Sequence, residues 1–67
     1  SEARLRSAVV IADVVSLHPE PASGAPAVTD IHEGVTVDVI GRQNGWIEVR
    51  LPNGATGWID ADSAAEI

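Results

Sequence analysis

The stretch GWIEVRLPNGATGWID, residues 45–60, decides the fold of this chain. Aliphatic residues occupy every second position of its first half, from Ile47 to Leu51, and a period of two is typical of a half-buried strand. The next residues, Pro52-Asn53-Gly54, suit a tight reversal, because proline fixes φ at the first corner and glycine readily adopts the left-handed conformation. The stretch therefore predicts a β-hairpin with a three-residue turn.

The turn length also fixes the register of this hairpin. If Leu51 and Ala55 close the turn, every facing pair of the two strands follows from them. Because side chains alternate along a strand, Trp46 and Trp58 are expected on the outer face, on a diagonal of about 7–8 Å that large side chains can span. The two tryptophans are the main candidate binding feature of the chain. The expected facing pairs are Val49–Gly57, Glu48–Trp58 and Ile47–Ile59.

Other segments rich in β-branched residues predict further short strands. Residues 8–17 predict one kinked strand or two short ones, with a bend at Ala12-Asp13. Residues 35–40 alternate cleanly, with their valines inward, and a turn with an Asn-Gly signal is expected over residues 41–45. Residues 27–32 and 65–67 complete the set of expected strands.

Three further segments are not expected to be extended strands. Residues 18–26 hold three of the four prolines and predict a loop. Residues 60–64 suit a single helical turn, because the Asp60 carboxylate can cap the free N–H groups that follow it. Residues 1–7 are polar and are expected to be a flexible tail or linker, so that the domain spans residues 8–67.

These elements together predict an all-β fold. Five or six short strands, a proline-rich loop and a helical turn near the C-terminus suit a small barrel. A flat sheet of this length would leave one face in water and its edges open, whereas closure into a barrel hides the edges.

Composition narrows the possible functions. Ten acidic residues against four arginines give a formal charge of −6, a surface that repels nucleic-acid phosphates and anionic membranes, so neither is an expected partner. There is no cysteine, and His18 and His32 lack the spacing of a ligand pair, so no metal or cofactor is expected. No serine lies in a nucleophile elbow, so the chain is not expected to be an enzyme or to hold catalytic residues. A monomer is expected.

The order of these motifs resembles a known family. Gly34 opens a V-x-V-x-V strand, N-G-W-x-x-V-R-L follows, and a tight turn leads to G-W-I, which resembles the bacterial SH3-like domains over residues 8–67. Within that family the chain looks most like the C-terminal SH3-like domain of Bat-type aerotolerance proteins. That likeness rests on A-V-V-I-A-D-V-V-S-L, I-H-E-G-V and D-A-D-S-A-A-E-I. It implies an SH3-like barrel in an exported or membrane-anchored parent chain with tetratricopeptide repeats.

The resemblance also bears on the candidate site. In eukaryotic members of the superfamily, aromatic residues at the positions matched by Trp46 and Trp58 help to line a groove for polyproline ligands, so these two residues are carried over as ligand-binding. The chain has no Tyr or Phe, and residues 60–63 depart from the proline- and tyrosine-bearing helical turn of the peptide binders. Recognition of ordinary P-x-x-P ligands is therefore disfavoured.

Acidic residues near the tryptophans suggest which ligands would bind. Glu48 and Asp60 are expected beside the indoles, and an acidic aromatic surface favours cationic or amine-bearing ligands such as basic peptides. One alternative is that these carboxylates only form a solvated face. Another is that the tryptophans form a structural lid, with Pro19 or Pro21 of the loop stacked on an indole.

The chain is thus expected to be a non-catalytic protein- or peptide-binding or scaffolding module of a larger exported or membrane-anchored protein. Its expected partner is a protein or peptide, either elsewhere in the parent chain or in another protein. Two alternatives stay open. One is a module that binds peptidoglycan, as bacterial SH3-like domains attached to wall hydrolases do, and the other is an inert structural terminus of a repeat protein.

Overall fold

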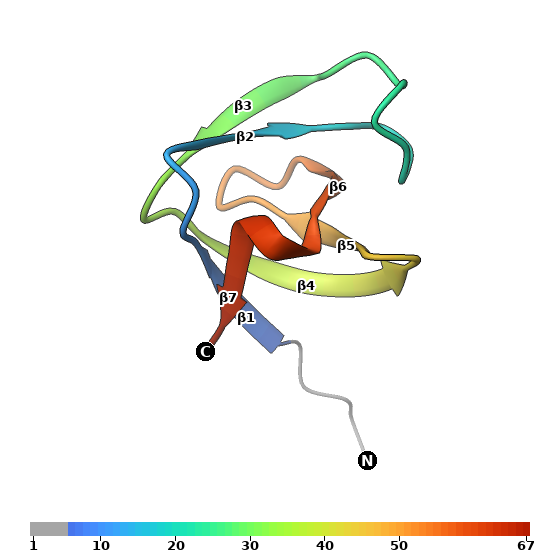
Figure 1. The fold of residues 1–67 in the computed structure, drawn as a ribbon. Helices are drawn as coiled ribbons and strands as arrows, with labels where there is room; N and C mark the ends of the chain where they lie inside the picture. The colour runs from blue at the N-terminus through green and yellow to red at the C-terminus, as the bar shows by residue number, and fades with distance from the viewer. Residues whose placement is uncertain (1–5) are drawn as a thin grey trace.

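The computed structural model describes residues 6–67, which form seven strands and one 3-10 helix (Figure 1). Five strands make an antiparallel sheet in the order β6-β5-β4-β1-β7, and β2 pairs with β3 in a separate two-stranded sheet. This confirms the all-β barrel, with seven strands where five or six are expected. The strands are β1 (Arg6–Val10), β2 (Val14–Leu17), β3 (Thr29–His32), β4 (Thr36–Gln43), β5 (Trp46–Arg50), β6 (Thr56–Asp60) and β7 (Ala64–Glu66), and the 3-10 helix η1 spans Ala61–Ser63.

The β5–β6 hairpin forms in the expected register. The Leu51 N–H donates to the Ala55 carbonyl over 2.7 Å, which closes the turn where the sequence predicts it. Within the turn, Gly54 has a φ of 92°, and Asn53 Oδ1 accepts the Ala55 N–H over 3.0 Å. Because the turn residues satisfy their own backbone groups, the register is fixed locally. The facing pairs include Val49–Gly57, Glu48–Trp58 and Ile47–Ile59.

The core is a single cluster of aliphatic side chains inside the barrel. Each of the strands from β1 to β6 contributes at least one buried residue to it, and no polar or charged side chain of residues 6–67 is buried. With no aromatic ring inside, the core depends on close packing of branched side chains. The buried residues are Ala8, Val10, Leu17, Ile31, Val37, Val39, Ile47, Val49 and Ile59.

The barrel closes where the end of β2 meets β6. The His18 N–H donates to the Trp58 carbonyl over 2.8 Å, and the Trp58 N–H donates back to the His18 carbonyl over 2.7 Å. Next to this bridge the fully buried Leu17 packs against Gly57. A methyl group on residue 57 would lie 2.6 Å from Leu17 Cγ and 2.9 Å from the His18 carbonyl oxygen, so only glycine fits.

The turn between β4 and β5 is shorter than the sequence predicts. The expected Asn-Gly turn forms, with φ of 50° at Asn44 and 83° at Gly45, but β4 continues to Gln43, so residues 41–43 are strand rather than turn. The reason is a bulge between Val39 and Gly41, which adds one residue to β4 and shifts its inward-outward alternation. A simple period of two does not reveal such a shift.

The N-terminal segment also differs from expectation. β1 begins at Arg6, two residues before the expected start of the first strand, and Arg6 and Ser7 pair with β4. The bend near Asp13 separates β1 from β2 into two strands of different sheets, so of the two arrangements left open the two-strand one is observed. Residues 1–5 of the expected tail lie outside the described residues.

The first and last strands are joined side by side. β7 pairs with β1, and the Glu66 carboxylate on β7 forms ion pairs with Arg6 of β1 and Arg42 of β4. Both arginines are more than half exposed, so each pair stabilises the fold by less than about 1 kcal/mol. Within residues 6–67, no helix is long and apolar enough to cross a membrane.

We expect Gly57→Ala to lower the free energy of unfolding by about 1–3 kcal/mol, because the added methyl group overlaps Leu17 and the His18 carbonyl. Urea denaturation followed by tryptophan fluorescence measures this change. Gly24→Ala is the matched control, since a methyl group there meets nothing within 4 Å and its effect should stay within about 0.5 kcal/mol. Equal stability of the two variants would contradict the closure described above.

Candidate functional site

The tryptophan face is the outer surface formed by His18, Gly41, Trp46, Glu48 and Trp58. Trp46 begins β5 and Trp58 lies in the middle of β6; both are half-buried, and their neighbours in each strand point into the core. Both tryptophans therefore lie on the outer face, as the alternation predicts. The two belong to different cross-strand pairs, so they are diagonal neighbours on the sheet.

His18 packs against Trp46. The centroids of the two rings are 5.5 Å apart and their planes are nearly perpendicular, at 89°. On its other side the His18 ring contacts the proline-rich loop, with Nδ1 2.8 Å from the Ala25 carbonyl oxygen. Because a carbonyl oxygen can only accept, Nδ1 carries the proton and donates it. His18 thus joins the loop to the indole of Trp46.

This contact corrects the sequence interpretation of His18. The sequence places it on a loop surface, and the structural alternative for the tryptophans stacks Pro19 or Pro21 on an indole. The ring found against Trp46 is that of His18, which is half-buried. No local motif indicates this contact, because it joins residues 28 positions apart that meet only after the barrel closes.

Glu48 lies beside Trp58 on the same face. The two residues face each other across β5 and β6, and Gly41 faces Glu48 from β4. A methyl group on residue 41 would lie 3.1 Å from Glu48 Oε1 and 4.0 Å from Trp58 Cη2, so the carboxylate and the indole edge both lie close to this glycine. A carboxylate next to an indole attracts a cation by charge and by the ring's π-electrons.

Asp60 caps the 3-10 helix at the edge of the tryptophan face. It faces Trp46 in the ladder, but its Oδ1 accepts the Asp62 N–H over 2.9 Å and caps η1. The helical turn is also tied to the β4–β5 turn, since the Ala61 N–H donates to the Gly45 carbonyl over 2.9 Å. The capping role predicted for Asp60 is confirmed, while its role as a ligand-binding residue stays a prediction.

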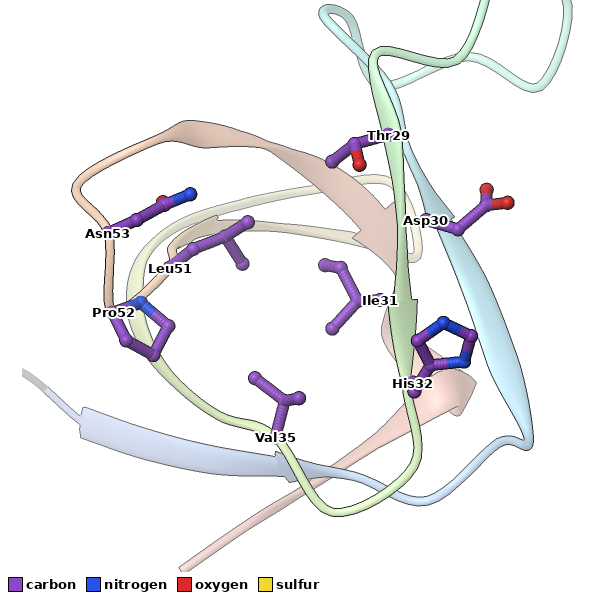
Figure 2. Close-up of a pocket in the computed structure, with 8 residues that line it drawn as sticks. All are labelled: Thr29, Asp30, Ile31, His32, Val35, Leu51, Pro52 and Asn53. Carbon is purple, nitrogen blue, oxygen red and sulfur yellow. The ribbon is translucent and has the colours of Figure 1, made fainter.

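A cavity lies away from the tryptophan face, next to the turn of the β5–β6 hairpin. It has a volume of about 340 Å³, and Figure 2 shows the side chains of Ile31, Val35 and Leu51 directed into it. The cavity could not be predicted from the sequence, because its walls come from three separate segments. The lining residues are Thr29, Asp30, Ile31, His32, Val35, Leu51, Pro52 and Asn53.

The described part of the chain brings no metal-binding group together. Over residues 6–67, no three His, Asp or Glu side chains lie close enough to hold an ion. The two histidines lie in different parts of the fold: His18 packs against Trp46, and His32 is exposed beside the cavity.

Comparison with known proteins identifies a family and a shared fold. The model of a family described as "Bacterial SH3 domain" matches residues 13–64. The structure of NlpC1 from Trichomonas vaginalis superimposes with a TM-score of 0.83 at 21% sequence identity, which shows a shared fold. That match covers 100% of this chain and 25% of the NlpC1 chain, so the chain spans about a quarter of the protein it resembles. No curated protein sequence matches.

We expect His18→Ala to lower the free energy of unfolding by about 1–2 kcal/mol, since it removes an edge-to-face aromatic contact and a hydrogen bond. His32→Ala is the matched control, because that side chain is exposed and should contribute less than about 0.5 kcal/mol. A double-mutant cycle of His18→Ala with Trp46→Ala should give a coupling energy of about 0.5–1.5 kcal/mol. A coupling near zero would show that the two rings do not interact in solution.

Proposed function

This chain belongs to the bacterial SH3 domain family, and we propose that it binds an amine-bearing or cationic peptide on the tryptophan face. The chain itself is a non-catalytic binding module. The observation that carries the proposed site is the carboxylate of Glu48 beside the Trp58 indole, on the same sheet surface as Trp46.

The geometry supports an aromatic and acidic site rather than a polyproline groove. Two half-buried indoles offer flat apolar surface, and tryptophan is enriched among residues that carry binding energy. In a polyproline groove the proline-rich loop would form the wall opposite the tryptophans. Here His18 contacts both this loop and Trp46, so the loop is held against the tryptophan face. A ligand with one cationic group beside Glu48 and an apolar part over Trp58 fits this surface better than a ridged proline helix.

Two sources of such a ligand share this chemistry. A basic segment of a protein, within the parent chain or in a partner, carries lysine or arginine side chains. A stem peptide of peptidoglycan carries free amines, and a peptidoglycan-binding module is the alternative reading of the same face. The inert structural terminus is the third reading, and it requires that neither source binds.

The parent protein is part of the same proposal. A domain of this size corresponds to a quarter of the NlpC1 chain, which supports a module within a larger protein. An exported or membrane-anchored location, the aerotolerance group and the tetratricopeptide parent come from the family resemblance, and they stay predictions. A full-length sequence that carries a signal segment would agree with this location.

A titration followed at the two indole N–H signals tests the proposed site. We expect a lysine-rich peptide or a soluble muropeptide with free amines to shift both signals, and the same peptide with its amines acetylated to lose most of its affinity. Trp58→Ala should raise Kd at least about tenfold, and Glu48→Gln about threefold or more, since each removes one part of the site. Pull-down with purified sacculi separates the wall source from the protein source.

Arg50→Ala is the matched control, because Arg50 lies on the same strand as Glu48 and is exposed. It removes a positive charge, so binding of a cationic peptide should stay the same or become slightly tighter. Unchanged indole signals with every peptide and with muropeptides would contradict the proposal and support the inert terminus.

A further inference from the structure

One edge of β3 has no neighbouring strand. In the described part of the chain, β3 pairs only with β2, and no strand pairs with its other side. Such an edge presents backbone donors and acceptors to any extended segment that approaches it. The free edge of β3 is therefore a candidate for a second binding surface, separate from the tryptophan face.

The register identifies which backbone groups face this open edge. The Glu33 N–H donates to the Asp13 carbonyl over 3.1 Å, which makes this a hydrogen-bonded position of the antiparallel ladder. Bonding alternates along a strand, so Ile31 bonds towards β2, whereas Asp30 and His32 direct their backbone groups to the open edge. The His32 carbonyl accepts the Val35 N–H over 3.3 Å. Both backbone groups of Asp30 and the N–H of His32 are thus available to a ligand.

The cavity lies alongside this edge. Figure 2 shows the side chains of Thr29 and Ile31 directed into the cavity, and those of Asp30 and His32 directed away from it. A strand added to β3 would therefore place alternate side chains over the opening of the cavity, whose far side is formed by Leu51 and Pro52. The volume of about 340 Å³ lies at the lower end of the range for small-ligand sites, about 300–1,000 Å³.

The charge of the surrounding segment indicates what kind of strand would bind. Residues 13–36 contain four acidic residues and neither lysine nor arginine. Two of the four, Asp13 and Glu33, are brought together at one end of the β2–β3 pair, and Asp30 lies on its outer face. Basic residues next to aliphatic ones would complement this edge. The acidic residues are Asp13, Glu20, Asp30 and Glu33.

We infer that the open edge of β3 binds an extended basic peptide by strand addition. The peptide bonds to the backbone of Asp30 and His32, its aliphatic side chains enter the cavity between Ile31 and Leu51, and its basic side chains lie on the outer face near Asp30. This inference does not depend on the function proposed for the tryptophan face, because the two surfaces share no residue.

A five-residue probe with the required pattern tests this inference. In acetyl-Lys-Val-Thr-Val-Lys-amide the valines share one face and the lysines the other. On titration into the ¹⁵N-labelled chain, we expect the amide signals of Asp30 and His32 to shift and their hydrogen exchange to slow. We also expect cross-peaks from the valine methyl groups to Leu51. The same probe with serine in place of valine should bind at least about tenfold more weakly, because it leaves the cavity unfilled.

Two pairs of variants separate the parts of the site, with affinity read from the His32 amide. Asp30→Pro removes the N–H at the open edge, and this position tolerates proline because that N–H is not part of the β2–β3 ladder. It should weaken binding at least about tenfold, whereas Asp30→Asn keeps the N–H and should cost about two- to threefold. Thr29→Trp should block the cavity and weaken binding of the probe. Its control is Thr56→Trp, at an exposed position of β6, which should leave the affinity unchanged.

Three outcomes would overturn the inference. The first is a probe that shifts only the indole signals, and the second is unchanged affinity of both Asp30→Pro and Thr29→Trp. The third is a concentration-dependent shift of the Asp30 and His32 amides in the chain alone, which would show that a second copy occupies the edge. If Asp30→Pro does not fold, Thr29→Trp against Thr56→Trp still decides.

Discussion

The contact of Leu17 with Gly57 is the constraint on which the rest of the structure depends. It brings β2 directly onto β6, where two backbone hydrogen bonds between His18 and Trp58 close the barrel. A core made only of aliphatic residues has no large ring to bridge a gap, so the strands must approach this closely. Glycine at residue 57 is what allows that approach.

The same closure arranges both candidate surfaces. It carries the His18 ring onto Trp46, which joins the proline-rich loop to the tryptophan face. On the other side of β2, in the described part of the chain, Ile31 of β3 faces Leu51 across the cavity and the far edge of β3 pairs with no strand. The hairpin contributes to both surfaces, with its tryptophans on the outside and its turn at the rim of the cavity. A chain of 67 residues thereby carries both of the surfaces that we propose as binding sites.

Local chemistry explains which features the sequence could predict. The register of β5 and β6 was predictable because Pro52, Asn53 and Gly54 fix it within three residues, and the Asp60 cap acts on the residue two positions ahead. The length of β4 was not, because a bulge shifts the alternation. The His18 contact and the cavity were not predictable either, since both join segments that are distant in the sequence and meet only in the folded chain.

NMR cross-peaks from the Leu17 methyl groups test the packing of Leu17 on Gly57 directly. We expect strong cross-peaks to the Gly57 Hα protons, together with slow hydrogen exchange of the His18 and Trp58 amides, if this packing holds. Cross-peaks from Leu17 to the Trp58 indole instead would contradict it. They would mean that β6 is shifted by one residue, with its tryptophan inside the barrel and its glycine outside.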